Sequence, residues 1–449
     1  MISLIVFFLM LVLYRHHRKW SLFLFFVSVT GGCGVIPFGE GALKIQDMGL
    51  AFILLICCYH LLIRDKAFFA TDKLAKRVWW LLGFVVAVAL FSIIYYEVPS
   101  VLVLRLIRFH LYILAYFVIR KQSCHDLQGA FNLLGTLTLV TAILFCFQIP
   151  LNKSLLLNPN ERLEVSDLYG GFSRFTNIPP YADLFLFLSL FTGSTYVLWR
   201  FKQKLWVPGI YVLMRLLTMG RTAILTTMGP LLLGICWMRR KYIKWIVVGA
   251  VLLTPVLAMV QNSFESRGTG GDIEGILRGD YKHYVVGHKG AGEETTMLYR
   301  VAWVYERIIY LSERPLIEQL MGLPYIPDEE ASLIRKYCIF SINNYDRTDD
   351  DQILNSYDIA LGNCVTRFGL LGTVILLSFW GYIWFFFYRN RRHPVAFAAL
   401  IYSISFALGS IAGTGFADLR NTVVFFALYL LVVKLPNARY ESVKTNLLF

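Results

Sequence analysis

Long apolar runs recur along this sequence, and few polar residues interrupt each run. A helix of about 20 apolar residues spans the hydrocarbon core of a bilayer, and neighbouring helices can satisfy an occasional polar group. The first, eighth and last of these runs are short. The sequence therefore predicts an all-α polytopic membrane protein with about 12–13 transmembrane helices. The expected spans are 2–14, 20–37, 47–64, 78–96, 99–119, 128–149, 179–199, 205–219, 222–238, 242–260, 368–388, 394–413 and 421–435.

Composition excludes a water-soluble fold. Hydrophobic residues make up 57% of the chain and charged residues 16%, whereas soluble domains have about 45–50% and about 25%. The first run, from Ile2 to Leu13, is followed rather than preceded by basic residues. We therefore interpret it as a membrane span and not as a signal peptide, whose charges precede its apolar region.

Lysine and arginine concentrate in alternate loops, and short cytoplasmic loops carry such an excess. This alternation predicts thirteen spans with the N-terminus outside. The formal charge of +14 then reflects topology, so we expect a lipid bilayer and no nucleic acid as a partner. The bases assigned to the cytoplasmic side are Arg15, Arg18, Lys19, Arg64, Lys66, Lys73, Lys76, Arg77, Arg120, Lys121, Arg200, Lys202, Lys204, Arg239, Arg240, Lys241, Lys244, Arg389, Arg391, Arg392, Lys434, Arg439 and Lys444.

The same pattern divides the chain into five parts. Residues 1–149 hold the N-terminal spans, 150–178 a first external loop, 179–260 the central spans, 261–367 a large external loop with short helices, and 368–449 the last spans and a cytoplasmic tail. In the large loop, apolar residues at helical spacing predict an amphipathic helix from Met297 to Ile309, ended by Pro315. Its polar face would carry Arg300 and Arg307, either as functional groups or as solvated charges. Cys338 and Cys364 of this loop could form a disulfide in an oxidising compartment, and the spacing leaves this open.

Several arginines lie on the external side, against the usual bias. Arg105 and Arg108 stand three residues apart in the fifth span, where an arginine needs a partner or a water-filled cavity. Arg174 lies in the first external loop, Arg221 heads the ninth span and Arg300 is in the large loop. A guanidinium presents a fork of donors that matches phosphate oxygens, so we predict that these residues line one cavity for a lipid diphosphate. The alternative is ion pairing with external acids. Further external arginines are Arg162, Arg215, Arg307 and Arg420.

Three stretches resemble the bacterial O-antigen polymerases and ligases. Gly170-Gly-Phe-Ser-Arg-Phe-Thr-Asn-Ile-Pro-Pro180 is similar to a Gly-Phe and Asn-Pro pattern of that family, and Met219-Gly-Arg-Thr-Ala223 to its Ser-Arg-Thr-Ala motif. Asp358 stands ahead of Gly369-Leu-Leu-Gly372, at a position where the family often has His or Arg. The stretch from Arg300 to Pro315 also matches its Arg, Trp and Glu-x-Pro pattern.

The resemblance implies polymerisation of undecaprenyl-diphosphate-linked repeat units of a surface polysaccharide, O-antigen or capsule, outside the bacterial inner membrane. A chain-length regulator is a further candidate partner. Asp358 would then be the general base for the acceptor hydroxyl, with Arg105, Arg108, Arg174, Arg221 and Arg300 binding the donor. We expect no cofactor and no metal, because arginines can stabilise the leaving diphosphate. The acidic cluster Asp346, Asp349, Asp350 and Asp351 is the alternative, as a cation site.

Other functions stay open at this point. An O-antigen ligase would use the same donor, although a ligase of this type is expected to have a histidine where Asp358 stands. A polysaccharide flippase is a second alternative, but such carriers seldom need a long soluble excursion. A scaffold or receptor would leave Arg105 and Arg108 unexplained. The sequence has no HExxH, Walker or GxSxG motif, so metallopeptidase, nucleotidase and hydrolase functions have no support.

Overall fold

The structure, a computed structural model, describes residues 2–36, 44–157, 164–165, 173–175, 178–192, 206–218, 221–238, 269–283, 296–340, 359–413 and 415–435. The regular secondary structure of these residues is helical apart from one antiparallel pairing of two-residue strands, β1 (Glu164–Val165) and β2 (Ser173–Arg174). The first third of the chain forms α1 (Ile2–His16), α2 (Arg18–Val29), α3 (Ile45–Leu62), α4 (Lys73–Ile94), α5 (Ser100–Ile107), η1 (His110–Leu114), α6 (Ala115–Arg120) and α7 (Cys124–Leu151).

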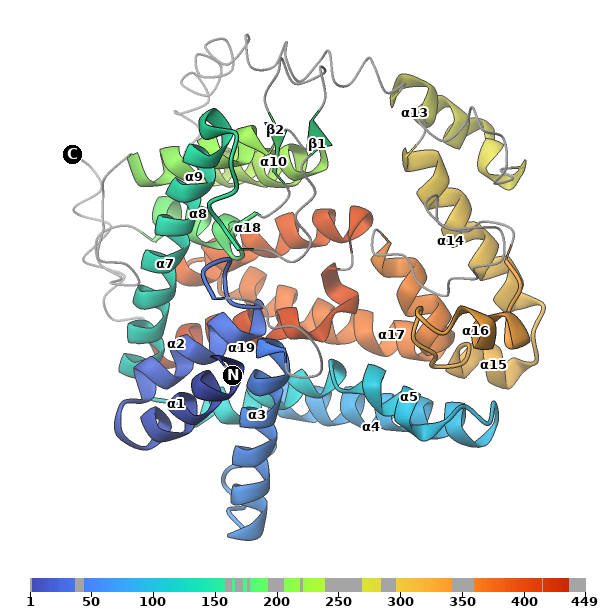
Figure 1. Ribbon diagram of the computed structural model, residues 1–449, viewed down its shortest axis with the longest axis horizontal. Coiled ribbons are helices and arrows are strands. Elements are labelled where there is room, and N and C mark those ends of the chain that lie inside the picture. The colour runs from blue at the N-terminus through green and yellow to red at the C-terminus, as the bar shows by residue number, and fades with distance from the viewer. Residues whose placement is uncertain are drawn as a thin grey trace.

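The later described residues form further helices (Figure 1). The central helices are α8 (Ala182–Phe191), α9 (Trp206–Leu217) and α10 (Arg221–Met238). The predicted large loop contains α13 (Thr269–Arg278), η4 (Asp280–His283), α14 (Thr296–Ser312), α15 (Leu316–Met321) and α16 (Ala331–Tyr337). The C-terminal elements are α17 (Ala360–Arg389), α18 (Pro394–Gly409), η5 (Ser410–Ala412), η6 (Gly415–Ala417), η7 (Leu419–Asn421) and α19 (Thr422–Lys434).

Every expected span that falls on described residues overlaps at least one helix, and 242–260 lies outside them. Among the described helices, α3, α4, α7 and α17 are long and apolar enough to cross a membrane. A fifth span results if α5 and the η1–α6 pair, which are bent by 44°, count as one. The remaining apolar helices have 10–17 residues. Four or five candidate spans are compatible with a polytopic membrane protein.

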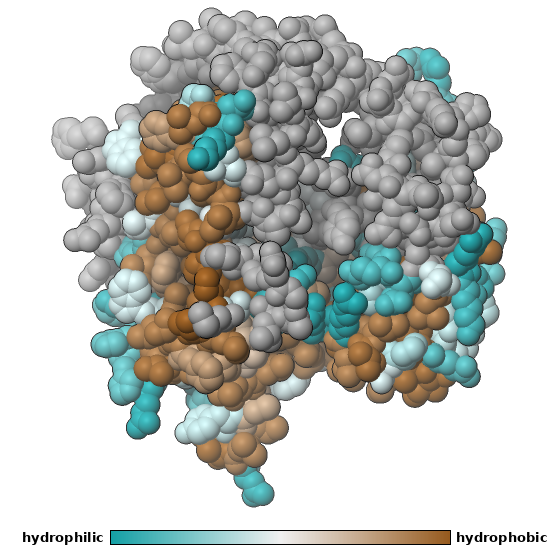
Figure 2. Space-filling model, viewed as in Figure 1, coloured by the Kyte–Doolittle hydropathy of each residue, from teal (hydrophilic) through white to brown (hydrophobic). Residues whose placement is uncertain are grey.

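Large apolar side chains lie on the outside of these helices. Leu62, Trp80, Ile94 and Val101 are 81%, 74%, 74% and 73% exposed, and Figure 2 shows hydrophobic surface along the left side, where Figure 1 places α7, and at the bottom of the view. Soluble monomers rarely expose extended apolar surface. A lipid environment accounts for it.

The buried centre is formed by α19. Its residues from Thr422 to Val432 are all buried, and α6, α7, α17 and α18 pack around it. The start of α4 follows a local capping rule: the Asp72 carboxylate accepts hydrogen bonds from the Leu74 and Ala75 amides at 2.9 and 2.7 Å, which satisfies otherwise unpaired donors there.

Basic residues expected on the cytoplasmic side meet at one end of the helices. Lys434 Nζ, at the end of α19, donates to the carbonyl of Arg120 at 2.8 Å. Lys121 Nζ lies 3.0 Å from Asp65 Oδ2, and this contact lowers the pKa of the Asp65 carboxyl. The α3–α4 connection, the end of α6 and the end of α19 therefore adjoin, as the alternation of basic loops requires.

The predicted amphipathic helix is present as α14, but Arg307 does not lie on a solvated face. Its side chain is fully buried, and its guanidinium carbon stands 4.1 Å from the Trp303 ring centroid and 3.8 Å from that of Phe340. Burial lowers its pKa to about 10, although the charge of Glu306 opposes this. Arg307 is thus part of the packing of this loop.

The two cysteines of the predicted loop, Cys338 and Cys364, are both buried free thiols. Burial raises the pKa of the Cys338 thiol to about 12, so it stays protonated near neutral pH. The structure therefore does not contain the Cys338–Cys364 disulfide, which the sequence had offered as a possibility.

Candidate functional site

Four arginines from three elements gather where α5 ends and the chain bends. Arg105 lies in α5 and Arg108 is its C-terminal cap. Arg367 lies in the first part of α17, and Arg420 lies in η7, between α18 and α19. We call these four residues the arginine site. Elements distant in the sequence thus bring cations together at one place.

The Phe109 ring joins two of these arginines. The guanidinium carbon of Arg108 is 4.7 Å from the ring centroid and that of Arg420 is 4.9 Å, both within cation–π range. The two guanidinium carbons therefore lie within about 10 Å of each other. One ligand with two phosphate groups could contact both.

Arg108 also reaches Asp47, in the first turn of α3, with 3.2 Å between Nη1 and Oδ1. Among the described residues, Arg108 Nε and Asp47 Oδ2 are buried and have no hydrogen-bond partner. Buried polar atoms are normally paired. Arg108 Nε itself is closed to solvent, but the Arg108 side chain is 30% exposed, and its exposed part is where a ligand oxygen could bind.

Arg420 is held more tightly than the other three arginines. Its Nε and Nη2 donate to the Asp418 carboxylate at 2.9 and 2.6 Å, in a two-pronged contact. Burial raises the pKa of Asp418, but the charge and hydrogen bonds of Arg420 outweigh this, and the pKa lies below its usual value. Both groups are therefore ionised near neutral pH, and Arg420 is a fixed positive group.

Arg367 is positioned by an aromatic network. Its guanidinium carbon is 5.4 Å from the Tyr325 ring centroid. The Tyr325 hydroxyl lies 3.0 Å from the His110 ring, and the Tyr325 amide donates to Ser92 Oγ at 3.1 Å. These contacts tie the segment after α15 to α4 and η1.

Two consecutive acids of that segment, Asp328 and Glu329, face Arg367 and Arg105. The distances are 3.9 Å from Arg367 Nη2 to Asp328 Oδ2 and 3.9 Å from Arg105 Nη2 to Glu329 Oε1. Arg105 and Glu329 are 49% and 61% exposed, and exposed pairs of this length contribute little stability. A stronger anion such as a diphosphate could replace these carboxylates.

A close backbone contact between α15 and α17, at Gly322 and Gly369, fixes this arrangement. Gly322 follows α15 and Gly369 interrupts α17, with φ of 92° and 62°. A Cβ on Gly369 would lie 2.5 Å from the Leu320 carbonyl oxygen, and one on Gly322 would lie 2.7 Å from the Arg367 carbonyl. The Leu323 amide donates to the Thr366 carbonyl at 2.7 Å beside this contact. Only glycine allows α15 to approach α17 this closely, two residues from Arg367.

The structure brings together part of the predicted site. Arg105 and Arg108 belong to the arginine site, with Arg420 of the further external arginines. Arg300 lies on α14, partly exposed, and α14 packs on α17. Arg174 belongs to β2 and Arg221 begins α10, but their side chains lie outside the described residues. The predicted convergence of all five donor-binding residues therefore stays a prediction.

Asp358 lies outside the described residues, as does the acidic cluster Asp346 and Asp349–Asp351. Among the described residues, no group of three or more His, Cys, Asp or Glu could hold a metal ion. The described range 296–340 is followed by 359–413, which begins directly after Asp358. The predicted general base is thus nine residues from Arg367 along the chain.

Ion pairing, the alternative that the sequence offered for single arginines, occurs throughout the arginine site. Each of the four has a carboxylate within 4.0 Å. The pairs differ in strength: that of Arg420 is short and two-pronged, whereas those of Arg105 and Arg367 are long. Pairing and ligand binding are therefore compatible for the latter two.

Arg215 has a structural role. Its Nε and Nη2 donate to both oxygens of Asp183 at 2.6 Å, and Thr227 Oγ1 donates to the same carboxylate at 3.0 Å. Arg215 and Asp183 are each 13% exposed. This buried contact joins α8, α9 and α10.

Arg367, and the acids that pair with the arginine site, were not identified as site residues from the sequence. Arg367 stands at the end of the predicted loop, two residues before Gly369, and its place in the glycine motif was the available signal. Asp47, Asp328 and Glu329 carry no such signal, because only the tertiary structure places them opposite arginines.

The sequence matches no model of a known protein family and no curated protein. The motifs quoted above are therefore the only basis for the resemblance to O-antigen polymerases and ligases. The fold and the described site define a class: a helical protein with several candidate membrane spans and a cluster of arginines at the bend of one candidate span.

Proposed function

We propose that this protein is a membrane glycosyltransferase that polymerises undecaprenyl-diphosphate-linked repeat units of a surface polysaccharide. In this proposal it has 12–13 spans in the inner membrane of a bacterium, and the 261–367 loop and the arginine site face outward. The observation that carries the proposal is the arginine site. Its four guanidinium groups lie beside lipid-facing helices, where a membrane-anchored diphosphate would be presented.

The reaction is glycosyl transfer. The acceptor hydroxyl oxygen forms a bond to the anomeric carbon of the donor sugar, and the bond from that carbon to the phosphate oxygen breaks. The hydroxyl proton passes to the Asp358 carboxylate, and the electron pair of the broken bond stays on the leaving lipid diphosphate. Positioned cations stabilise such developing charge, which is the role of Arg105, Arg108, Arg367 and Arg420, with no metal required.

The arginines differ in their tasks. Arg420 is fixed by Asp418 and keeps a positive potential at the site, while Arg105 and Arg367 exchange their long carboxylate contacts for phosphate oxygens. Arg108 offers the exposed part of its guanidinium side chain. Arg174, Arg221 and Arg300 complete the donor site in this proposal, and Asp358 in place of the ligase histidine favours polymerase over ligase.

The test uses purified protein in liposomes with an undecaprenyl-diphosphate-linked oligosaccharide, scored for a ladder of longer glycans. The proposal predicts a ladder, and predicts that Arg221→Ala weakens donor binding and polymerisation together. Arg391→Ala, which removes an exposed arginine at the other end of the helices, is the matched control and should behave as wild type. Transport of the unit across the bilayer without a new glycosidic bond would instead establish a flippase. Transfer of a preformed glycan to a lipid core would establish a ligase.

A further inference from the structure

The short helix α15 presents apolar side chains outward from a position beside two candidate spans. Leu316 and Ile317 are 69% and 45% exposed. Glu318, the next residue, is buried and accepts a hydrogen bond from the Tyr95 hydroxyl at 3.0 Å. One side of α15 is therefore fixed to the end of α4, and another side is left uncovered.

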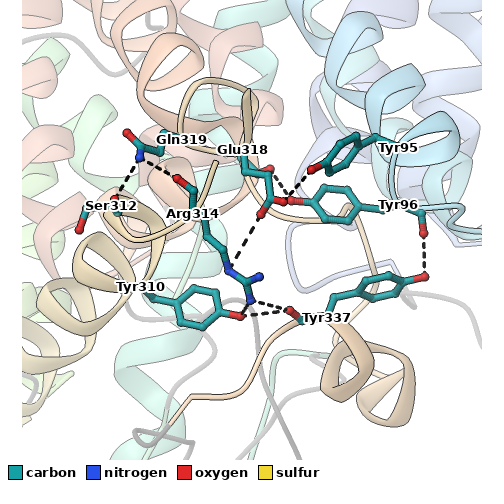
Figure 3. A network of polar contacts seen from close by, with 9 residues as sticks. Tyr95, Tyr96, Tyr310, Ser312, Arg314, Glu318, Gln319 and Tyr337 are labelled. Atoms are coloured by element: carbon teal, nitrogen blue, oxygen red, sulfur yellow. Dashed lines mark hydrogen bonds and ion pairs between the residues drawn. The ribbon is translucent and has the colours of Figure 1, made fainter. Parts of the chain in front are cut away.

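The polar network around Glu318 fixes α15 further (Figure 3). Arg314 Nε lies 4.0 Å from Glu318 Oε2, and Arg314 Nη2 donates to the Tyr337 carbonyl at 3.0 Å. The Tyr337 hydroxyl donates to the Tyr96 carbonyl at 2.7 Å. Together with the Gly322–Gly369 contact, these bonds place α15 at the level of residues 92–96 of the α4 end and 366–371 of α17.

At that same level the two spans expose apolar residues that require lipid. Ile94 is 74% exposed, and Leu370 and Leu371 are 49% and 44% exposed. Figure 2 shows hydrophobic side chains among hydrophilic ones where Figure 1 places the ends of α4 and α5 near α15. The exposed residues of α15 thus continue the lipid-facing surface of the spans.

We infer that α15 is an interfacial helix, inserted through Leu316 and Ile317 into the leaflet at the arginine-site end of the protein. A helix with one apolar and one polar side takes this position at a membrane boundary. Its partner is the lipid bilayer, and the inference requires only that α4 and α17 span the membrane, not the proposed activity.

The position of α15 has a consequence for the arginine site. The segment that follows α15 carries Asp328 and Glu329, which contact Arg367 and Arg105. Seating α15 in the leaflet therefore holds the arginine site at the depth of lipid headgroups. A lipid-linked anion could reach it without leaving the membrane.

The test is photocrosslinking of the full chain in nanodiscs of phosphatidylethanolamine and phosphatidylglycerol. A benzophenone amino acid replaces Leu316 in one variant and Ile317 in a second, so that one remains if the other fails to fold. Val374, 64% exposed on α17, is the lipid-facing reference. Leu277 is the matched control, because it is 83% exposed on α13 beside the exposed Glu274 and Arg278.

Mass spectrometry should find phospholipid adducts at 316 and 317 comparable with those at 374, and few or none at 277. Absence of lipid adducts at both α15 positions, with adducts at 374, would overturn the inference. Crosslinks from 316 to a second protein chain in place of lipid would also overturn it and identify α15 as a protein contact.

Discussion

Replacing Gly369 by alanine is expected to destabilise the protein strongly, because two separate costs coincide there. The residue has φ 62° and ψ −168°, a region that is essentially limited to glycine and costs other residues about 1–3 kcal/mol. The new Cβ would also lie 2.5 Å from the Leu320 carbonyl oxygen and 2.6 Å from the Gly322 amide nitrogen. Both opposing atoms are backbone, so relief requires α15 to move away from α17.

That movement removes the Leu323–Thr366 hydrogen bond, worth about 1 kcal/mol. The expected total is a loss of about 2–4 kcal/mol in the free energy of unfolding. Thermal unfolding of the purified protein in detergent measures it. Gly381→Ala, in the same helix and with no heavy atom within 4 Å of the new Cβ, is the control and should be neutral or stabilising by about 0.5–1 kcal/mol. Equal unfolding temperatures for the Gly369 and Gly381 variants would refute the claim that only glycine fits at position 369.

Three further predictions concern the site and the bundle. Asp358→Asn should slow ladder formation by about 10²–10⁴ with donor binding unchanged, and near-normal polymer would exclude Asp358 as the base. Glu329→Gln should tighten donor binding by up to about five-fold, since it removes the carboxylate that competes at Arg105 in an exposed pair worth about 0.2–1 kcal/mol. An affinity that titration finds unchanged would contradict the exchange of Glu329 for phosphate at Arg105. Asp183→Asn should cost about 3–5 kcal/mol in thermal unfolding by leaving Arg215 buried without its counter-ion, and a wild-type unfolding temperature would show that the pair is not structural.

The spans were the most predictable part of the fold, because their apolar runs depend on composition alone. The α7 helix and α4 follow the expected segments closely, with Asp72 capping α4 as its residue type predicts. The expected span 179–199 is described only to Phe191 as helix. The bend after Arg108 was not predicted, since apolar runs continue across it.

The site was less predictable, because its residues meet only through tertiary contacts. Membrane depth drew attention to Arg105 and Arg108, and sidedness drew attention to Arg420; all three belong to the arginine site. Helical spacing placed Arg307 on a polar face, but the Phe340 ring, from a later segment, covers it together with Trp303. Packing between elements overrides a pattern that is read within one helix.

Direct measurement of donor binding tests the central claim, that the arginine site holds a lipid diphosphate. Wild-type protein in nanodiscs, titrated with an undecaprenyl-diphosphate-linked oligosaccharide, should bind it, and the double variant Arg105→Ala/Arg367→Ala should bind about 100-fold more weakly or worse, since each charge-assisted hydrogen bond contributes about 1.5–3 kcal/mol. Arg391→Ala should bind as wild type does. Equal affinity for the wild type and the double variant would contradict the assignment of the arginine site as the donor site.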